Sequence, residues 1–451
     1  MNDTICAIST ALGVGAISII RVSGKEAIEI TNKIFKGKNL NNVETHTIHY
    51  GYIIDNDEVI DEVLVSVMKA PKTFTMEDVV EINCHGGIAT TNRVLELLLE
   101  NGCRLAESGE FTKRAFLNGR IDLMEAEAVM DLINTKTDLS RKISINQLQG
   151  YGSKMIKDLR NDLINIISNI EVNIDYPEYN DIYEVTRTDI VDKIGNIKDK
   201  LEKILNSYKN GKIIKDGINT VIVGRPNVGK SSILNKLLEY DKAIVTDIPG
   251  TTRDIVEGSA NIDGITLNFI DTAGIRETDD VVEKIGVQKS LNSIDNADLV
   301  LIILNNNEEL SEVDKEIIEK TKNKTSIIVV NKDDLDKKLD LSEYFDRNII
   351  YTNTLDYEGI DSLKKEIKRL FNFDKIEMTD YNVISNARQV SKIKDSLNRI
   401  NDIYSGLEND LPLDMLEIDL RDIWDVLGEL VGESYDEELL DNLFSKFCVG
   451  K

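Results

Sequence analysis

Residues 224–232 read Gly224-Arg225-Pro226-Asn227-Val228-Gly229-Lys230-Ser231-Ser232, which fits the phosphate-loop pattern of Gly, four residues and Gly-Lys-Ser. An apolar run of strand character, 219–223, precedes the loop, and a stretch with helical spacing, 233–238, follows it. In such a loop, backbone N–H groups wrap phosphates, the lysine neutralises phosphate oxygens, and the serine hydroxyl reaches magnesium. An ordinary glycine-rich turn is the alternative, and the motifs further along the chain weigh against it.

Two further motifs follow predicted strands. Asp271-Thr272-Ala273-Gly274 can bind magnesium through water and sense the γ-phosphate. In Asn331-Lys332-Asp333-Asp334, the carboxylate of Asp334 can accept hydrogen bonds from N1–H and the exocyclic amine of guanine. Adenine has no such amine and would leave that carboxylate unpaired, so the motif selects GTP. Thr251-Thr252 supplies a switch hydroxyl for magnesium, and the ordered set predicts a GTPase.

The region around these motifs, residues 217–376, alternates apolar strands with helical stretches and predicts a mainly parallel, doubly wound α/β domain. The expected strands are 221–223, 265–270, 299–304, 327–330 and 349–351.

Helical segments flank the nucleotide domain on both sides. Residues 119–216 and 377–451 carry apolar residues spaced by three and four, and a linker is expected at Gly211 and Gly217. We expect the two parts to pack together as one helical domain, with the nucleotide domain inserted into it. Residues 1–118 mix strand and helix patterns and predict an α+β domain.

Composition limits the functional classes. With 80 acidic and 54 basic residues the net charge is −26, so nucleic acid can be contacted only through a local basic patch or a partner's surface. No apolar run approaches the roughly 18 residues that a membrane span needs. The start of the chain has no export pattern, and cytoplasmic localisation is expected. The cysteines lack metal-ligand spacing and are expected to be buried reduced thiols; they are Cys6, Cys84, Cys103 and Cys448.

One position departs from the Ras type of GTPase. Ile275 stands where that type has a glutamine that orients the attacking water, and isoleucine cannot hydrogen-bond water. Another group must therefore serve catalysis. Asn227 and Glu283 are polar candidates, although either could be a solvated loop residue.

Several stretches resemble the tRNA modification GTPase family MnmE, also called TrmE, from one end of the chain to the other. They include Ser9-Thr10-Ala11, residues 81–87, residues 111–123, Pro249 to Asp254, and the terminal Phe447-Cys448-Val449-Gly450-Lys451. The resemblance implies an N-terminal α+β domain that binds folate and dimerises, a helical domain, and an inserted potassium-stimulated GTPase domain.

The resemblance also implies the activity. With MnmG, a partner protein that carries FAD, members add a (carboxymethyl)aminomethyl group to carbon 5 of the wobble uridine of certain tRNAs. The one-carbon unit comes from a tetrahydrofolate derivative, the 5-formyl or 5,10-methylene form. A heterotetramer with MnmG and transient dimerisation of the GTPase domains are expected.

Site residues follow from the same resemblance. Ser231 and Thr252 would bind magnesium, and Glu283 would orient the attacking water through a bridging water. The potassium ligands would be Asn227, Thr246, Ile248 and Thr251. The GTP-binding residues would be Asn227, Val228, Gly229, Lys230, Ser231, Ser232, Thr246, Asp247, Ile248, Pro249, Gly250, Thr251, Thr252, Asp271, Thr272, Ala273, Gly274, Asn331, Lys332, Asp334, Asn353, Thr354 and Leu355.

The folate contacts would be Arg21, Glu81, Arg120 and Lys451. Glu81 can accept from a pterin amine and N–H, while basic groups suit the glutamate tail. Cys448 matches the family's terminal cysteine and is a second catalytic candidate beside Glu283, with a mobile tail thiol as the alternative. Asn353-Thr354-Leu355 departs from the family's usual Ser-Ala-Lys or Ser-Ala-Arg, a loop that packs on guanine through backbone N–H groups, so GTP binding is still expected.

Two other functions stay open at this point. A ribosome-assembly GTPase of the same superfamily would act mainly as an RNA-binding switch, and a nucleotide-regulated helical scaffold would have no chemistry of its own. An assembly GTPase should carry an RNA-binding module or a second GTPase unit. Here a single set of motifs is followed by acidic helices and the Cys-Val-Gly-Lys end.

Overall fold

The computed structural model describes residues 3–175, 187–240, 256–270, 294–353, 358–373 and 384–451. The chain divides into two compact units. Unit 1 comprises residues 1–133, 147–197 and 395–451, and unit 2 comprises residues 134–146 and 198–394. Helices α7 (Arg187–Asp216) and α13 (Ala387–Glu408) carry residues of both units.

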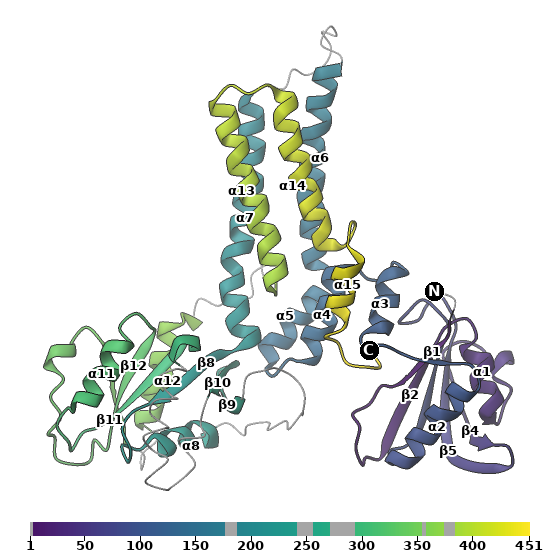
Figure 1. Cartoon of the computed structure of the whole chain (residues 1–451), viewed down its shortest axis with the longest axis horizontal. Coiled ribbons are helices and arrows are strands. Elements are labelled where there is room, and N and C mark those ends of the chain that lie inside the picture. Colours follow the sequence, from purple (N-terminus) through teal and green to yellow (C-terminus); the bar gives the residue numbers. More distant parts are fainter. Residues whose placement is uncertain (1–2, 176–186, 241–255, 271–293, 354–357, 374–383) are drawn as a thin grey trace. The chain divides into compact units, whose positions relative to one another are not determined.

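Unit 1 begins with a seven-stranded sheet (Figure 1). Neighbouring strands pair antiparallel, except that β1 pairs parallel with β7. In spatial order the strands are β3 (Phe35–Lys36), β4 (Thr47–Asp55), β5 (Glu58–Met68), β6 (Val79–His85), β2 (Ile17–Ser23), β1 (Ile5–Ile8) and β7 (Arg104–Leu105).

Helices α1 (Ala27–Ile34) and α2 (Ile88–Glu100) cover one face of this sheet. Alternate strand residues such as Val65, Val80 and Val22 are buried with them in one core. Because successive side chains point to opposite faces of a strand, residues such as Arg21 and Glu81 belong to the other face. Those two are paired directly in the register of β2 and β6.

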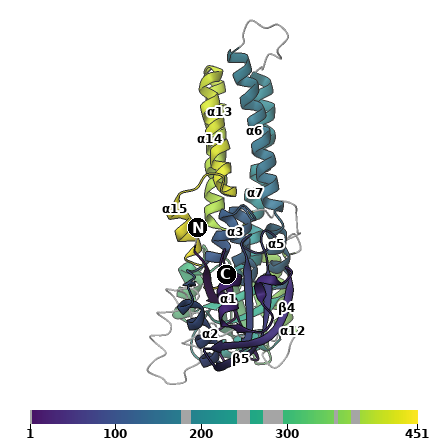
Figure 2. The ribbon, with the colours of Figure 1, turned by 90° about the vertical axis from the view of Figure 1, so that its right-hand side faces the viewer.

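The helices of unit 1 include α3 (Glu110–Leu117), α4 (Leu123–Ile133), α6 (Tyr151–Asp175), α14 (Leu413–Val431) and α15 (Glu437–Phe444). Helices α6 and α14 lie side by side (Figure 1 and Figure 2). Arg160 Nε donates to the Trp424 carbonyl at 3.0 Å, and Arg421 pairs with Glu171. The two contacts fix an antiparallel pair that joins segments far apart in the sequence.

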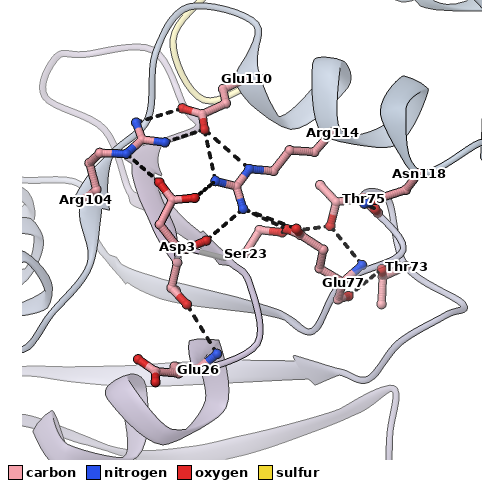
Figure 3. Close-up of polar contacts among 11 residues, drawn as sticks. Asp3, Ser23, Glu26, Thr73, Thr75, Glu77, Arg104, Glu110, Arg114 and Asn118 are labelled. Carbon is pink, nitrogen blue, oxygen red and sulfur yellow. Dashed lines mark hydrogen bonds and ion pairs between the residues drawn. The ribbon is translucent and has the colours of Figure 1, made fainter. Parts of the chain in front are cut away.

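A buried arginine ties α3 to the sheet (Figure 3). The side chain of Arg114 is 1% exposed, and its guanidinium contacts Glu110 Oε1 at 3.0 Å, Asp3 Oδ1 at 2.9 Å and Glu77 at 3.2 Å. Arg104 also pairs with Glu110 and Asp3. Burial alone would raise the pKa of Glu110, but hydrogen bonds from Arg104, the Glu107 backbone and Arg114 leave that pKa lowered. The carboxylate is therefore held in its charged form.

Unit 2 contains a six-stranded sheet that is parallel except for β9. In spatial order the strands are β13 (Asn348–Tyr351), β12 (Ser326–Asn331), β11 (Leu299–Asn305), β8 (Ile218–Val223), β10 (Ile265–Ile270) and β9 (Val256–Ile262). The central strands are continuous apolar runs because both faces are covered. The helices with the most residues in this unit are α5 (Asp138–Leu148), α7, α8 (Lys230–Tyr240), α11 (Glu312–Lys320) and α12 (Glu358–Leu370).

Helices lie on both faces of this sheet. Leu301 and Val329 share a core with Leu237 of α8 and Leu363 of α12. The alternate residues of the same strands, such as Ile302, share a second core with residues of α11. The predicted fold class is thus confirmed: an α+β N-terminal part, helices, and an α/β phosphate-loop domain with a mainly parallel sheet.

Most expected strands appear within two or three residues of their predicted ends. Strands β1, β3, β4, β7 and β9 were missed. Strand β9, Val256–Ile262, contains polar residues and a glycine and forms an antiparallel edge. The expected linker at Gly211 is wrong, since α7 continues through it to Asp216. The proposed boundaries of the 1–118, 119–216, 217–376 and 377–451 segments stay predictions. Within the described ranges, no helix is both long and apolar enough to span a bilayer.

Candidate functional site

The phosphate loop lies between the end of β8 at Val223 and the start of α8 at Lys230. The ammonium group of Lys230 donates to the carbonyls of Gly224 at 3.0 Å and Arg225 at 2.8 Å, so it lies back across the loop. Asn227 at the loop tip is exposed and adopts a φ of 60°. Ser231 and Ser232 are exposed in the first turn of α8. A cation, helix amides and hydroxyls thus gather where a phosphate chain would bind.

The Asn-Lys-x-Asp motif contacts this loop directly. Asn331 Nδ2 donates to the Val228 carbonyl at 2.9 Å, and Lys332 Nζ donates to the Asn227 carbonyl at 3.1 Å. Gly229 has a φ of 102°, and a Cβ there would collide with the Asn331 amide. Only glycine fits both the backbone and the contact. Base recognition by this motif stays a prediction. The structure shows that Asn331 and Lys332 of the motif contact the phosphate loop.

The residues proposed to contact the guanine base lie at the same edge of the sheet. Asp334 is exposed just beyond β12, and Asn353 is half-buried just beyond β13. The neighbouring Asp333 is fixed, because its N–H donates to the Thr352 carbonyl at 3.3 Å and its side chain accepts from Asn306 at 3.2 Å. Carboxyl ends of parallel strands meet at one edge, which explains why motifs distant in sequence converge here.

Sequence reasoning missed the support on the other side of the loop. Arg225 forms ion pairs of 2.8 Å with Glu308 and with the buried Asp314. Asp314 is also the N3 residue of the capping box that Ser311 forms at the start of α11. The Ser-x-x-Asp spacing was the available signal for the helix start.

Other predicted nucleotide and metal residues lie outside the described residues. They are Thr246, Asp247, Ile248, Pro249, Gly250, Thr251, Thr252, Asp271, Thr272, Ala273, Gly274, Glu283, Thr354 and Leu355. Ile275 lies outside them as well.

A second group of predicted residues gathers in unit 1. Arg21 Nε donates to Glu81 Oε1 at 2.9 Å, and Arg21 Nη1 donates to the Gly450 carbonyl at 3.2 Å. Ser9 Oγ donates to the same carbonyl at 3.1 Å. Lys451, which follows, is half-buried. The C-terminus is thereby brought to the face of the sheet that α1 and α2 leave uncovered.

Aromatic rings complete this second group. The Arg120 guanidinium lies 4.8 Å from the ring centre of Phe74, and that of Arg21 lies 5.8 Å from it. Arg21 also lies 5.7 Å from the Phe111 ring centre. Two arginine side chains, one carboxylate and two rings therefore converge with the Gly450 carbonyl, from segments spread over the whole chain. Both Arg21 contacts with Glu81 use Oε1.

The terminal segment is more firmly held than the expected mobile tail. Val449 forms an antiparallel bridge with Ser108, and the Gly109 N–H donates to the Cys448 carbonyl at 3.3 Å. Gly450 has a φ of 92°, and a Cβ there would collide with the Ile8 carbonyl. Cys6, Cys84 and Cys103 are buried as predicted, whereas the Cys448 side chain is exposed, so the expectation of a buried thiol is wrong for that residue.

The loop between β8 and α8, braced by an Asn-Lys-x-Asp motif at the end of a parallel strand, defines a P-loop GTPase. Two family models match the chain: the MnmE helical domain over residues 123–448 and the GTP-binding protein TrmE N-terminus over residues 4–120. The chain belongs to the tRNA modification GTPase MnmE family. It is accordingly a GTP-hydrolysing enzyme.

Curated relatives match along the full length. Proteins named tRNA modification GTPase MnmE from Bacillus licheniformis and Bacillus subtilis are each 51% identical over 458 residues, covering 100% of both chains. The relative of that name from Ligilactobacillus salivarius is 52% identical over 456 residues, covering 100% of this chain and 98% of the relative.

Among solved structures, Era in complex with MgGDPNP and nucleotides of 16S ribosomal RNA is 31% identical. That match covers 34% of this chain and 56% of Era, with a TM-score of 0.26.

Proposed function

We propose that this chain is the GTP-hydrolysing component of a complex that modifies the wobble uridine of tRNA. With an MnmG-type partner that carries FAD, it adds a (carboxymethyl)aminomethyl group at carbon 5, using a tetrahydrofolate one-carbon unit. The observation that carries the proposal is identity of about half of all residues with MnmE proteins over the entire chain. The acidic net charge of −26 fits a protein that reaches tRNA mainly through its partner's surface. We propose that the complex acts in the cytoplasm.

The second group of residues supports the folate part of this proposal. The Glu81 carboxylate suits an amine and an N–H of a pterin ring, and Arg21, Arg120 and Lys451 suit the carboxylates of a glutamate tail. The contacts of Arg21 with Glu81 and with the carbonyl of Gly450, the residue before Lys451, support this grouping. When bound, a tetrahydrofolate supplies the one-carbon unit; these residues bind and orient it.

The phosphate loop supports the GTP part. Lys230 and the first turn of α8 would hold the phosphates, and Ser231 with Thr252 would hold magnesium. The residues at this helix N-terminus fit both ligands. The lysine and the backbone N–H groups suit phosphate oxygens, and the serine hydroxyl suits magnesium. Bound magnesium supplies charge neutralisation for the phosphates.

Self-association belongs to the same proposal. The face of the N-terminal sheet away from α1 and α2 exposes Ile48, Tyr50 and Leu64, which are 66%, 57% and 47% exposed. An apolar sheet face of this kind fits a homodimer through the N-terminal domain. Sedimentation that showed only monomers would contradict it.

Nucleoside analysis of tRNA from a strain that lacks this gene tests the function. We expect the modified wobble uridine to disappear and to return when the gene is restored on a plasmid. A strain restored with the Lys230→Ala variant should stay unmodified. Intact modification in the deletion strain, with defects in ribosome assembly, would instead favour an assembly GTPase.

Potassium stimulation is tested at Asn227, which we propose as a potassium ligand together with Thr246, Ile248 and Thr251. Asn227 has a φ of 60°, so Asn227→Gly removes the amide oxygen without straining the backbone. Wild-type GTP hydrolysis should be faster in potassium than in sodium by about tenfold or more. The reason is that a cation bound beside the transferred phosphate stabilises the charge that develops in the transition state. The variant should lose that gain while matching the wild type in sodium. Equal wild-type rates in both salts would remove the potassium assignment.

A further inference from the structure

The loop that joins β5 to β6, residues 69–78, is fixed at both of its sides; we call it the Phe74 loop (Figure 3). Ser23 Oγ lies 2.7 Å from both Thr75 Oγ1 and Glu77 Oε2. Asn118, at the end of α3, donates to the Thr75 carbonyl at 2.7 Å. The loop is therefore held between strand β2 and helix α3 rather than left to solvent.

Arg114 supplies the charged contact in this arrangement. Its Nη1 donates to both oxygens of Glu77 at 3.2 Å and to the Asp3 carbonyl at 2.9 Å. The groups that face the guanidinium from all sides are the carboxylates of Asp3, Glu77 and Glu110. A buried, forked donor with charged acceptors holds its partners in one geometry. These contacts hold the side chain of Glu77, three residues after Phe74, in one position.

The ring of Phe74 lies between the core and the proposed folate residues. Phe74 packs against a small cluster of Ile5, Ala7, Ala106 and Phe111, and against a second cluster that includes Ala115 and Phe116. The Arg120 and Arg21 guanidiniums lie 4.8 Å and 5.8 Å from its centre. Phe74 is half-buried, and two of the proposed ligand-binding cations lie beside its ring.

We propose that Phe74 is a further folate-binding residue and that Arg114 positions it through Glu77. The inference rests on the proposed folate function. Folates carry a flat pterin and a flat p-aminobenzoyl ring, and an aromatic side chain is a stacking surface for either. Arginine carries the complementary charge for the carboxylates of the glutamate tail. Phe74 would thus add an apolar contact to a site whose other members are charged.

Calorimetric titration of the full chain with 5-formyltetrahydrofolate tests the ring. Phe74→Leu should weaken binding by about tenfold, the usual scale for losing one aromatic stacking partner. Phe74→Tyr should bind within about threefold of the wild type, since the ring remains. Phe345→Leu is the matched control, because Phe345 is 86% exposed in unit 2, and its affinity should equal that of the wild type.

The titrations of the wild type and of Phe74→Leu test the folate function and the role of Phe74 separately. If the wild type binds and Phe74→Leu binds equally well, the role of Phe74 is wrong while the folate function stands. If the wild type does not bind, the folate function fails and this inference fails with it.

A double-mutant cycle tests the positioning role. Glu77→Gln removes the charge that Arg114 holds while keeping the shape, and should weaken folate binding by about threefold or more, the usual scale for a lost charge-assisted contact. In a Phe74→Leu background the same change should have no further effect, because the ring through which it acts is absent. Additive losses would show that Glu77 acts on folate by another route and would overturn the positioning role.

Discussion

Lys230→Ala should lower the rate of GTP hydrolysis by about 100- to 1000-fold, the range seen when one transition-state charge contact is removed. The physical reason is that Lys230 is the cation of the phosphate loop, and its ammonium lies within 3.0 Å of the loop carbonyls of Gly224 and Arg225. Alanine leaves the developing charge on the transferred phosphate without that partner. A phosphate-release assay at saturating GTP measures the rate.

The matched control is Lys320→Ala, which removes the same side chain from a half-exposed ion pair with Glu316 on α11. It should change the rate by less than about twofold, because a surface ion pair contributes little. Thermal unfolding of both variants should match the wild type. A Lys230→Ala protein that hydrolyses GTP normally would place the catalytic nucleotide site elsewhere.

Arg114→Met should destabilise the α3 region by about 3–5 kcal/mol, which is the usual cost of removing one partner from a buried ionic cluster. Methionine fills part of the volume but cannot donate to Glu77, Asp3 and Glu110, which now contact the guanidinium. Hydrogen exchange of the α3 amides is the measurement, because it reports the free energy of local opening of this helix. Global unfolding is less suitable, since a chain with two units need not unfold in a single step.

Two comparisons make that result specific. Lys113→Met, one residue earlier, breaks an ion pair with the exposed Asp441 and should cost only about 0–1 kcal/mol. Adding Glu77→Gln to Arg114→Met should recover part of the loss, because it removes a carboxylate left without its partner. Equal protection of α3 in Arg114→Met and wild type would mean that the network does not stabilise this helix.

The nucleotide site was largely predictable because its parts are local. Gly224 to Ser232 carry their own strand, turn and helix signals, and Asn331 and Asp334 directly follow an apolar strand. What the sequence did not reveal was the contact of Asn331 and Lys332 with the loop, or the brace from Arg225 to Asp314. Those contacts depend on the order β12, β11, β8 in the sheet, which no residue spacing contains.

The second site was less accessible to sequence reasoning. Only the family resemblance grouped Arg21 and Glu81 with Arg120 and Lys451. The structure pairs Arg21 with Glu81 across β2 and β6. It also seats Phe74 and the Arg114 network beside them, which neither pattern nor resemblance suggested.

By itself, the sequence determined the class of chemistry: phosphate binding, a preference for guanine, and helices on either side of an α/β domain. These follow from short-range rules, because turn geometry, hydrophobic period and donor type act over a few residues. Only the tertiary structure decided which distant residues share the second site. Arg21 and Gly450 are 429 positions apart, and their contact exists because antiparallel register, a terminal β-bridge and a glycine that alone fits beside Ile8 bring the two ends of the chain together.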